Sequence, residues 1–222
     1  MPEPSPRLVG IDPVVGEPTL AVVRAGRRRF RVRRVDIEPL SLVPGLVLTA
    51  EHLLHLEQAT STARAWTAAM RMLARTPIAQ ATMRAKLGQR FGDAAAHCVV
   101  DELTRAGLID DVQAAESLRR RLERAGPIGP AKFARALAQQ HIDPDVAEAA
   151  VHDLDTGQDA MEAATAAARA ILPALARLNS ETRRRRLAGR LARRGFDADT
   201  VLQVLEHVCE MPIDNSRYDA DP

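Results

Sequence analysis

The stretch Gly107-Leu108-Ile109-Asp110-Asp111 decides how this chain is divided, because it can end one helix and begin the next. A glycine directly after an apolar-periodic run enters the left-handed conformation that ends many helices, since it has no Cβ to clash. An aspartate can then accept hydrogen bonds from the free N–H groups of the following helix. The stretch is therefore interpreted as a corner between two helices, with Asp110 and Asp111 as caps.

A related pattern occurs at three other places along the chain. An apolar residue is followed by a capping aspartate and then by a run with apolar residues at helical spacing: Phe91 with Asp93, Ile142 with Asp143, and Phe196 with Asp197. A leucine of the preceding helix stands shortly before each of these markers: Leu87, Leu137 and Leu191. A match of cap, spacing and apolar phase at intervals of about fifty residues predicts tandem helical repeats.

A further helix is expected at the front of each repeat. The first spans residues 63–75 with Trp66, Met70 and Leu73 on one face, the second 111–124, and the third 159–178, which Pro173 should divide. Thr76-Pro77 should cap the next helix of the first repeat, and Ser180 should begin that of the third. The prediction is a mainly α protein with three tandem three-helix repeats, at residues 63–110, 111–157 and 158–210, forming an elongated curved rod.

The residues before the repeats predict a small β extension. Residues 1–17 are rich in proline and acids and are expected to form a flexible arm. Residues 18–60 should hold a β-hairpin with its turn at Ala25-Gly26-Arg27-Arg28, followed by a short helix that Thr49 caps and that ends near Gln58. Residues 211–222, rich in Pro, Asp and Asn, are expected to be disordered.

The hairpin is dense in positive charge, since seven of the eleven residues from Arg24 to Arg34 are arginine. Arginines that alternate with apolar residues would give the hairpin a basic face able to bind phosphates. The candidates for nucleic-acid contact are Arg24, Arg27, Arg28, Arg29, Arg31 and Arg33. The alternative is a solvated edge strand that its charge keeps from aggregating.

A second basic surface is expected on the repeats. Arg186, Arg190 and Arg193 share one helix face, while Leu187 and Leu191 mark the buried face. The candidates for binding a negatively charged partner are Arg119, Arg120, Arg124, Lys132, Arg135, Arg183, Arg186, Arg190, Arg193 and Arg194. For any single arginine, a solvated helix face is the competing explanation.

The sequence offers no support for catalysis. It has no phosphate-binding glycine loop and no nucleophile elbow, and its six histidines do not form a ligand pattern. Cys98 and Cys209 are expected to be buried free thiols in a reducing compartment. No signal peptide or membrane-spanning run is recognisable. We therefore expect a cytoplasmic protein that is not an enzyme, and that needs no metal, cofactor or membrane.

Several motifs in the repeats resemble those of the RecX family of regulatory proteins. Gly107 to Asp111, followed by Ala115-Glu116-Ser117, is similar to the element that leads into the second repeat of that family. Arg124-Ala125-Gly126-Pro127, residues 137–142 and residues 191–196 are similar to its second- and third-repeat motifs. The resemblance covers about residues 63–209 and departs at Ala114, where an aromatic residue is common. The basic hairpin looks like an N-terminal extension of some members.

The resemblance implies a bacterial protein without catalytic activity that acts in homologous recombination, DNA repair and the SOS response. Such proteins bind the RecA filament on DNA and limit its extension, ATPase, strand-exchange and co-protease activities. A stack of repeats would lie in the filament groove, each unit adding a modest contact. A monomer is expected. The residues also leave open a protein that binds DNA directly through the hairpin and the arginine-rich helices, or an adaptor for another helical partner.

Overall fold

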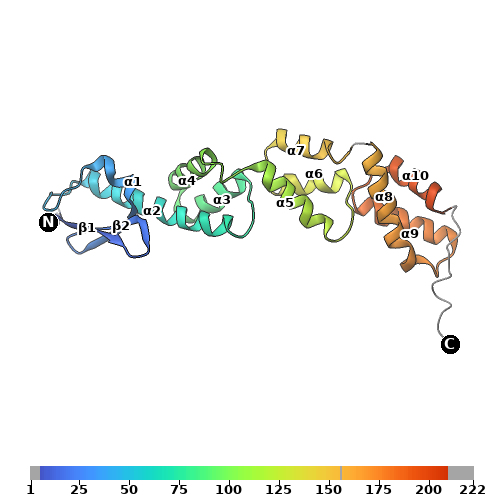
Figure 1. Cartoon of the computed structure of the whole chain (residues 1–222), viewed down its shortest axis with the longest axis horizontal. Helices are drawn as coiled ribbons and strands as arrows, with labels where there is room; N and C mark the ends of the chain where they lie inside the picture. Colours follow the sequence, from blue (N-terminus) through green and yellow to red (C-terminus); the bar gives the residue numbers. More distant parts are fainter. Residues whose placement is uncertain (1–5, 156, 210–222) are drawn as a thin grey trace, which may run out of the picture. The chain divides into compact units, whose positions relative to one another are not determined.

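The chain is mainly helical, and its computed structural model describes residues 6–155 and 157–209 (Figure 1). In that part, ten α-helices follow a three-stranded antiparallel sheet. The predicted fold class, three tandem three-helix repeats behind a small β extension, is confirmed. The chain separates into two compact units between Asp110 and Asp111. We call the described residues up to Asp110 unit 1 and those from Asp111 onward unit 2.

The sheet contains the predicted hairpin and one strand more. Its strands are β1 (Leu8–Val14), β2 (Glu17–Ala25) and β3 (Arg28–Arg33), in the order β1-β2-β3. Gly26, with φ +57°, occupies the turn of the hairpin, where Ala25 pairs with Arg28. The hairpin turn is thus confirmed, and its left-handed backbone explains the glycine.

The prediction of a flexible arm over residues 1–17 is wrong from Leu8 onward, because β1 pairs along β2. Leu8 is buried in a core with Val23 and Leu48, which gives the strand an apolar anchor. Pro13 is tolerated because β1 is an edge strand, where one missing N–H donor does not break a ladder on both sides. Residues 1–5 of the arm, and the tail at 211–222, lie outside the described residues.

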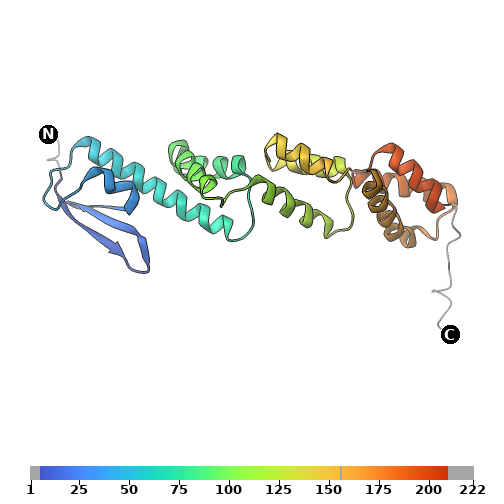
Figure 2. The same cartoon turned by 45° about the horizontal axis from the view of Figure 1, so that its top comes forward.

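A short helix α1 (Arg34–Ile37) and a 3-10 turn lead to the long helix α2 (Ala50–Leu73). Thr49 caps α2 by accepting the N–H of His52, as predicted, but the expected end near Gln58 is wrong (Figure 2). Thr60 and Thr67 donate back to carbonyl oxygens one turn earlier, so their hydroxyls are satisfied inside the helix. Burial of Ala59 and Ala63 then outweighs the weak helix propensity of the Thr/Ser run.

The first repeat consists of the second half of α2 with α3 (Gln80–Phe91) and α4 (Asp93–Arg105). Its core holds Leu87, as predicted, but small residues, Ala65 and Ala69, form the buried seam of α2. Met70, expected on that seam, is 39% exposed. The cap predicted at Thr76-Pro77 is also wrong, because α3 begins only at Gln80.

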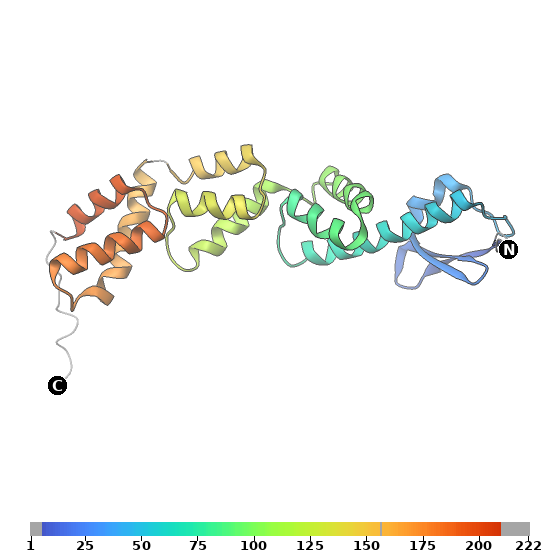
Figure 3. The same cartoon turned by 180° about the vertical axis from the view of Figure 1, so that it is seen from behind.

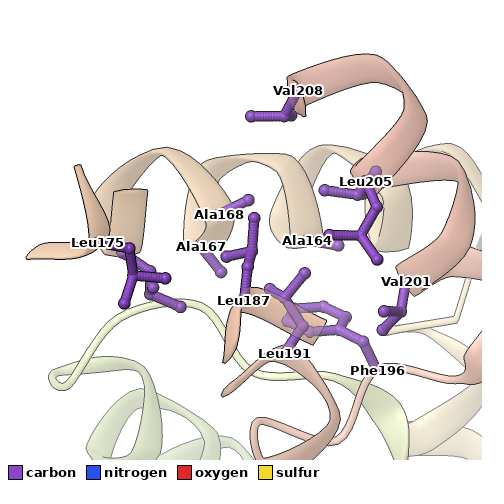
Figure 4. Packing of buried hydrophobic residues seen from close by; sticks show 12 residues of the cluster. Ala164, Ala167, Ala168, Leu175, Leu187, Leu191, Phe196, Val201, Leu205 and Val208 are labelled. Atoms are coloured by element: carbon purple, nitrogen blue, oxygen red, sulfur yellow. The ribbon is translucent and has the colours of Figure 1, made fainter. Parts of the chain in front are cut away.

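Unit 2 contains the second and third repeats (Figure 3). The second consists of α5 (Asp111–Glu123), α6 (Pro130–Gln139) and α7 (Pro144–His152). The third consists of α8 (Gly157–Ile171), a 3-10 turn (Leu172–Leu175), α9 (Ser180–Arg193) and α10 (Ala198–Cys209). Pro173 ends α8 at the 3-10 turn, as predicted. Alanines of α8 allow Leu187, Leu191 and Phe196 to pack closely against α8, in one core with apolar residues of α10 (Figure 4).

The predicted helix ends are confirmed in part. Gly107 is left-handed, with φ +69°, and Asp143 and Asp197 cap α7 and α10. Asp93 is not a cap, because Gly92 takes the cap position and Asp93 is the first residue of α4. Asp111 also begins its helix, and its carboxylate accepts the N–H of Asp143 at 2.8 Å. That bond ties the start of α5 to the start of α7 within the second repeat.

Cys98 is a free cysteine, but the prediction that it is buried is wrong, because it lies exposed on α4. Partial burial still raises the pKa of its thiol. The side chain of Cys209 lies outside the described side chains.

Candidate functional site

Most of the hairpin arginines are engaged with carboxylates of the same unit. Arg24 contacts Asp12 at 2.6 Å, Arg31 contacts Glu17 at 2.7 Å, and Arg28 pairs with Glu57. Arg27 and Arg29, next to the turn, are exposed and make no ion pair within the described residues. Of the six arginines predicted to contact nucleic acid, these two are the most available.

Arg33 cannot serve as a surface contact, and its prediction as a nucleic-acid ligand is wrong. Its side chain is 6% exposed and donates to both carboxylate oxygens of Asp36 and to Glu102. Its guanidinium also lies 4.9 Å from the ring centroid of Trp66. Burial alone would lower the pKa of Arg33, but the two carboxylates raise it further than burial lowers it. Arg33 therefore joins β3 to α1, α2 and α4 as a permanent cation.

The predicted basic residues of the second repeat are only partly free. Arg119 pairs with Glu123 and Arg120 with Glu116, each at 2.9 Å and one turn apart on α5. Such exposed pairs are worth about 0.3–0.5 kcal/mol, so a stronger anion could displace them. Arg124 is exposed, and the Nε of Arg135 donates to the carbonyl of Ala131. Lys132 packs its stem beside Gly195.

The clearest predicted surface lies on α9. Arg183, Arg186, Arg190 and Arg193 follow one face of the helix, and Leu187 and Leu191 on the adjoining face are fully buried. In the described part of the chain these four arginines have no ion-pair partner. We call these four residues the α9 stripe.

Arg194, predicted as part of the same surface, instead holds the second and third repeats together. Its guanidinium donates to the carbonyl oxygens of Pro127 at 2.9 Å and Ala125 at 3.0 Å. Beside it, the N–H of Gly129 donates to the carbonyl of Arg194 itself at 2.8 Å. Arg194 is therefore less available to a partner than the other predicted arginines of α9, because two of its donors are used inside unit 2.

A third basic surface, which the sequence did not indicate, lies in unit 1. It is a cleft of about 450 Å³ between β3, α2 and α3. Its cationic side chains are Arg31, Arg64, Arg71, Arg75, Lys86 and Arg90. Among the residues that line it, all within the described part of the chain, none is acidic. We call it the unit 1 cleft.

The cleft is hard to find in the sequence because its cations are dispersed along the chain. Arg64 and Arg71 stand two turns apart on α2, Arg75 follows in the turn after that helix, and Lys86 and Arg90 stand one turn apart on α3. The sequence feature that could have indicated the cleft is this helical spacing of basic residues, and it is clear only once α2 is known to be unbroken. The conspicuous arginine run at Arg24–Arg34 gave a stronger signal but leads mostly to paired side chains.

No group of three or more His, Cys, Asp or Glu side chains within the described residues is arranged to hold a metal ion. None of the helices in residues 6–155 and 157–209 is long and apolar enough to cross a membrane.

Comparisons of the sequence with known proteins point to one family. The family model described as "RecX, third three-helix domain" matches residues 158–205. Regulatory protein RecX of Prosthecochloris aestuarii is 31% identical over 127 residues, which are 57% of this chain and 81% of that protein. Regulatory protein RecX of Thermobifida fusca is 30% identical over 149 residues, 67% of this chain and 80% of that protein.

Solved structures share the fold. A crystal structure of regulatory protein RecX matches with a TM-score of 0.73 and 17% sequence identity, covering 90% of this chain and 99% of the other. The crystal structure of RecX from Lactobacillus salivarius matches with a TM-score of 0.59 and 18% identity, covering 68% of this chain and 97% of the other. At these identities the likeness concerns the fold alone.

Proposed function

This chain belongs to the RecX family of regulatory proteins, and we propose from that premise that it binds the RecA filament on DNA and limits the extension of the filament. In this proposal the protein acts without chemistry of its own, as a monomer in the cytoplasm. Slower filament extension would lower the ATPase, strand-exchange and co-protease activities of RecA, and so act on recombination, repair and the SOS response.

The α9 stripe is the observation that carries the proposal for a binding surface. It lies in the third repeat, the part that the family model matches, and its guanidinium groups are not committed to carboxylates of the described chain. Arginine in such a row suits carboxylates on a partner protein, since its planar fork can bind them bidentately. A protein of tandem repeats can touch several subunits of a filament with modest contacts that add up.

An ATPase titration tests the regulatory role. The purified chain is added to its cognate RecA on circular single-stranded DNA, and ATP hydrolysis is followed at increasing ratios of regulator to RecA. We expect inhibition at substoichiometric ratios, because one blocked filament end stops the addition of many subunits. An unchanged rate up to equimolar protein would overturn the proposal.

Charge reversal tests the surface. The triple variant Arg186→Glu, Arg190→Glu, Arg193→Glu should need at least about tenfold more protein for half-inhibition, as expected when several charge pairs at a protein interface are lost. The matched control is Arg105→Glu, Arg169→Glu, Arg177→Glu, which changes the net charge equally at exposed positions outside the stripe. Equal loss in both triples would show that overall charge, rather than the stripe, drives the effect.

The alternative of direct DNA binding through the hairpin has less support, because Arg24, Arg28 and Arg31 are paired and Arg33 is buried. Arg27 and Arg29 alone would leave few phosphate contacts. Affinity without RecA should accordingly change little in an Arg27→Gln, Arg29→Gln variant.

A further inference from the structure

The unit 1 cleft collects positive charge that the described chain does not neutralise. Arg64, Arg71, Arg75, Lys86 and Arg90 form no ion pair, whereas Arg24, Arg28 and Arg84 elsewhere in the unit each contact a carboxylate. Five unpaired cations around one concave space repel each other, and the low dielectric of the walls strengthens the repulsion. A bound polyanion would relieve it.

The spacing of the cations suits a linear ligand. Arg64 and Arg71 stand on one face of α2, about 10 Å apart along the helix axis at 1.5 Å per residue, and Arg75 follows in the turn just after the helix. Lys86 and Arg90 face the same space from α3. The cations thus line both walls of a trough rather than surround one point, and they can meet successive phosphates of one strand.

The uncharged part of the cleft suits nucleobases. Phe91 forms part of the wall, with the guanidinium carbons of Arg90 and Arg64 at 5.2 and 5.9 Å from its ring centroid. Met72 and Leu20 add further apolar surface. An aromatic ring and guanidinium planes are the surfaces on which bases stack, and a plain acidic peptide would leave them unused. This combination favours a polynucleotide over an acidic protein segment.

The dimensions favour one strand over two. The cleft encloses about 450 Å³ between β3, α2 and α3, which is too little space for a duplex to enter. A duplex would have to rest on the rim, where it reaches fewer of the cations.

We propose that the unit 1 cleft binds a single polynucleotide strand, with Arg64, Arg71, Arg75, Lys86 and Arg90 on its phosphates and Phe91 beside its bases. The site needs no RecA, and it is separate from the α9 stripe of unit 2. Arg31 also lines the cleft, but it is paired with Glu17.

The test is fluorescence anisotropy of the full chain with a labelled 20-residue oligothymidylate, without RecA, across a series of salt concentrations. The variant Arg71→Gln, Arg75→Gln, Lys86→Gln should bind at least about tenfold more weakly at low salt, because three phosphate contacts are lost. Its slope of log K against log salt should fall in magnitude by about 2, at about 0.7 for each contact with a single strand. All three side chains are exposed, so circular dichroism should show an unchanged fold.

The matched control, Arg105→Gln, Arg169→Gln, Arg177→Gln, removes the same charge outside the cleft and should weaken binding less than about twofold if the contacts are local. Equal loss in both triples, or binding that does not depend on salt, would overturn the proposal. It would also be overturned by a duplex of the same length, or by polyglutamate, competing better than the unlabelled strand. These readouts contain no RecA, so their failure leaves the ATPase test of the regulatory role intact.

Discussion

Two junctions within this protein are built in different ways. In unit 1 the sheet is joined to the first repeat by the side chain of Arg33, which reaches Asp36 and Glu102 across 2.7 Å contacts. In unit 2 the guanidinium of Arg194 also bridges the second and third repeats, but there the backbones themselves meet: Gly129 donates to the carbonyl of Arg194, and Ala131 donates to that of Gly195 at 3.1 Å. The contacts of Arg33 depend on charge, whereas the backbone contacts at Gly129 and Gly195 depend on the absence of side chains at these two glycines.

The largest effect is expected where the backbones meet. A Cβ added at Gly195 would lie 2.3 Å from the backbone nitrogen of Lys132, and its φ of +91° disfavours any other residue. Gly195→Ala should therefore lower the free energy of unfolding of unit 2 by about 3 kcal/mol, from strain and a clash that backbone cannot relieve cheaply. Urea unfolding followed by far-UV circular dichroism measures this.

Two features make the Gly195 test selective. Gly189 on α9 is the matched control, because an added Cβ would meet only the flexible end of Arg193 at 3.5 Å, and Gly189→Ala should be neutral or stabilising by up to about 1 kcal/mol. Trp66, the single tryptophan, reports on unit 1. Its fluorescence transition should not move in Gly195→Ala, and a shift in both signals would contradict separate junctions.

A smaller effect is expected at the charged junction. Arg33→Met keeps most of the buried stem but leaves Asp36, with a 15% exposed side chain, without its cation. We expect unit 1 to lose about 2–3 kcal/mol, less than for a fully buried pair because Glu102 is partly hydrated. Trp66 fluorescence in urea measures the loss. Arg34→Met, at the exposed neighbour, should cost less than about 0.5 kcal/mol, and equal losses would show that Arg33 contributes only general charge.

The two junctions also differ in how far sequence alone could reveal them. Gly126, Gly129 and Gly195 interrupt helical runs, so a turn at each of these positions was predictable from local chemistry. Arg33 is one of the seven arginines between Arg24 and Arg34, and nothing in the local sequence shows that Arg33, rather than Arg27 or Arg31, is buried. Its role depends on Glu102, which is distant in sequence and is brought close only by the packing of α4.

The same distinction explains the other successes and misses. The repeats were predictable because Leu87, Leu137 and Leu191 mark a core with local helical period. The strand β1 was missed because its burial depends on pairing with β2, and the unit 1 cleft because its cations come together only in the folded unit. Tertiary packing also keeps α2 helical across its Thr/Ser run, where local helix propensity predicted that the helix would end.

The smallest effect concerns the aspartates that follow the apolar markers, which again differ between the units. Asp197 accepts the N–H of Thr200 at 2.8 Å and its hydroxyl at 2.6 Å, and these bonds from Thr200 lower the pKa of the Asp197 carboxyl. Asp197→Ala should cost about 1 kcal/mol at pH 7, the usual value of a helix cap. Asp93→Ala in unit 1 should cost only a few tenths, because Asp93 is not a cap.

The stabilisation by Asp197 is expected to decrease as the pH falls. Because folding lowers the pKa of Asp197, its stabilisation is fully present above the unfolded value of about 3.9 and is lost as pH falls through the lower folded value. The difference in melting temperature between the natural chain and Asp197→Ala should therefore shrink from pH 7 to pH 2.5. A difference that persists at pH 2.5 would mean that Asp197 acts through packing beside Phe196 rather than through its charge.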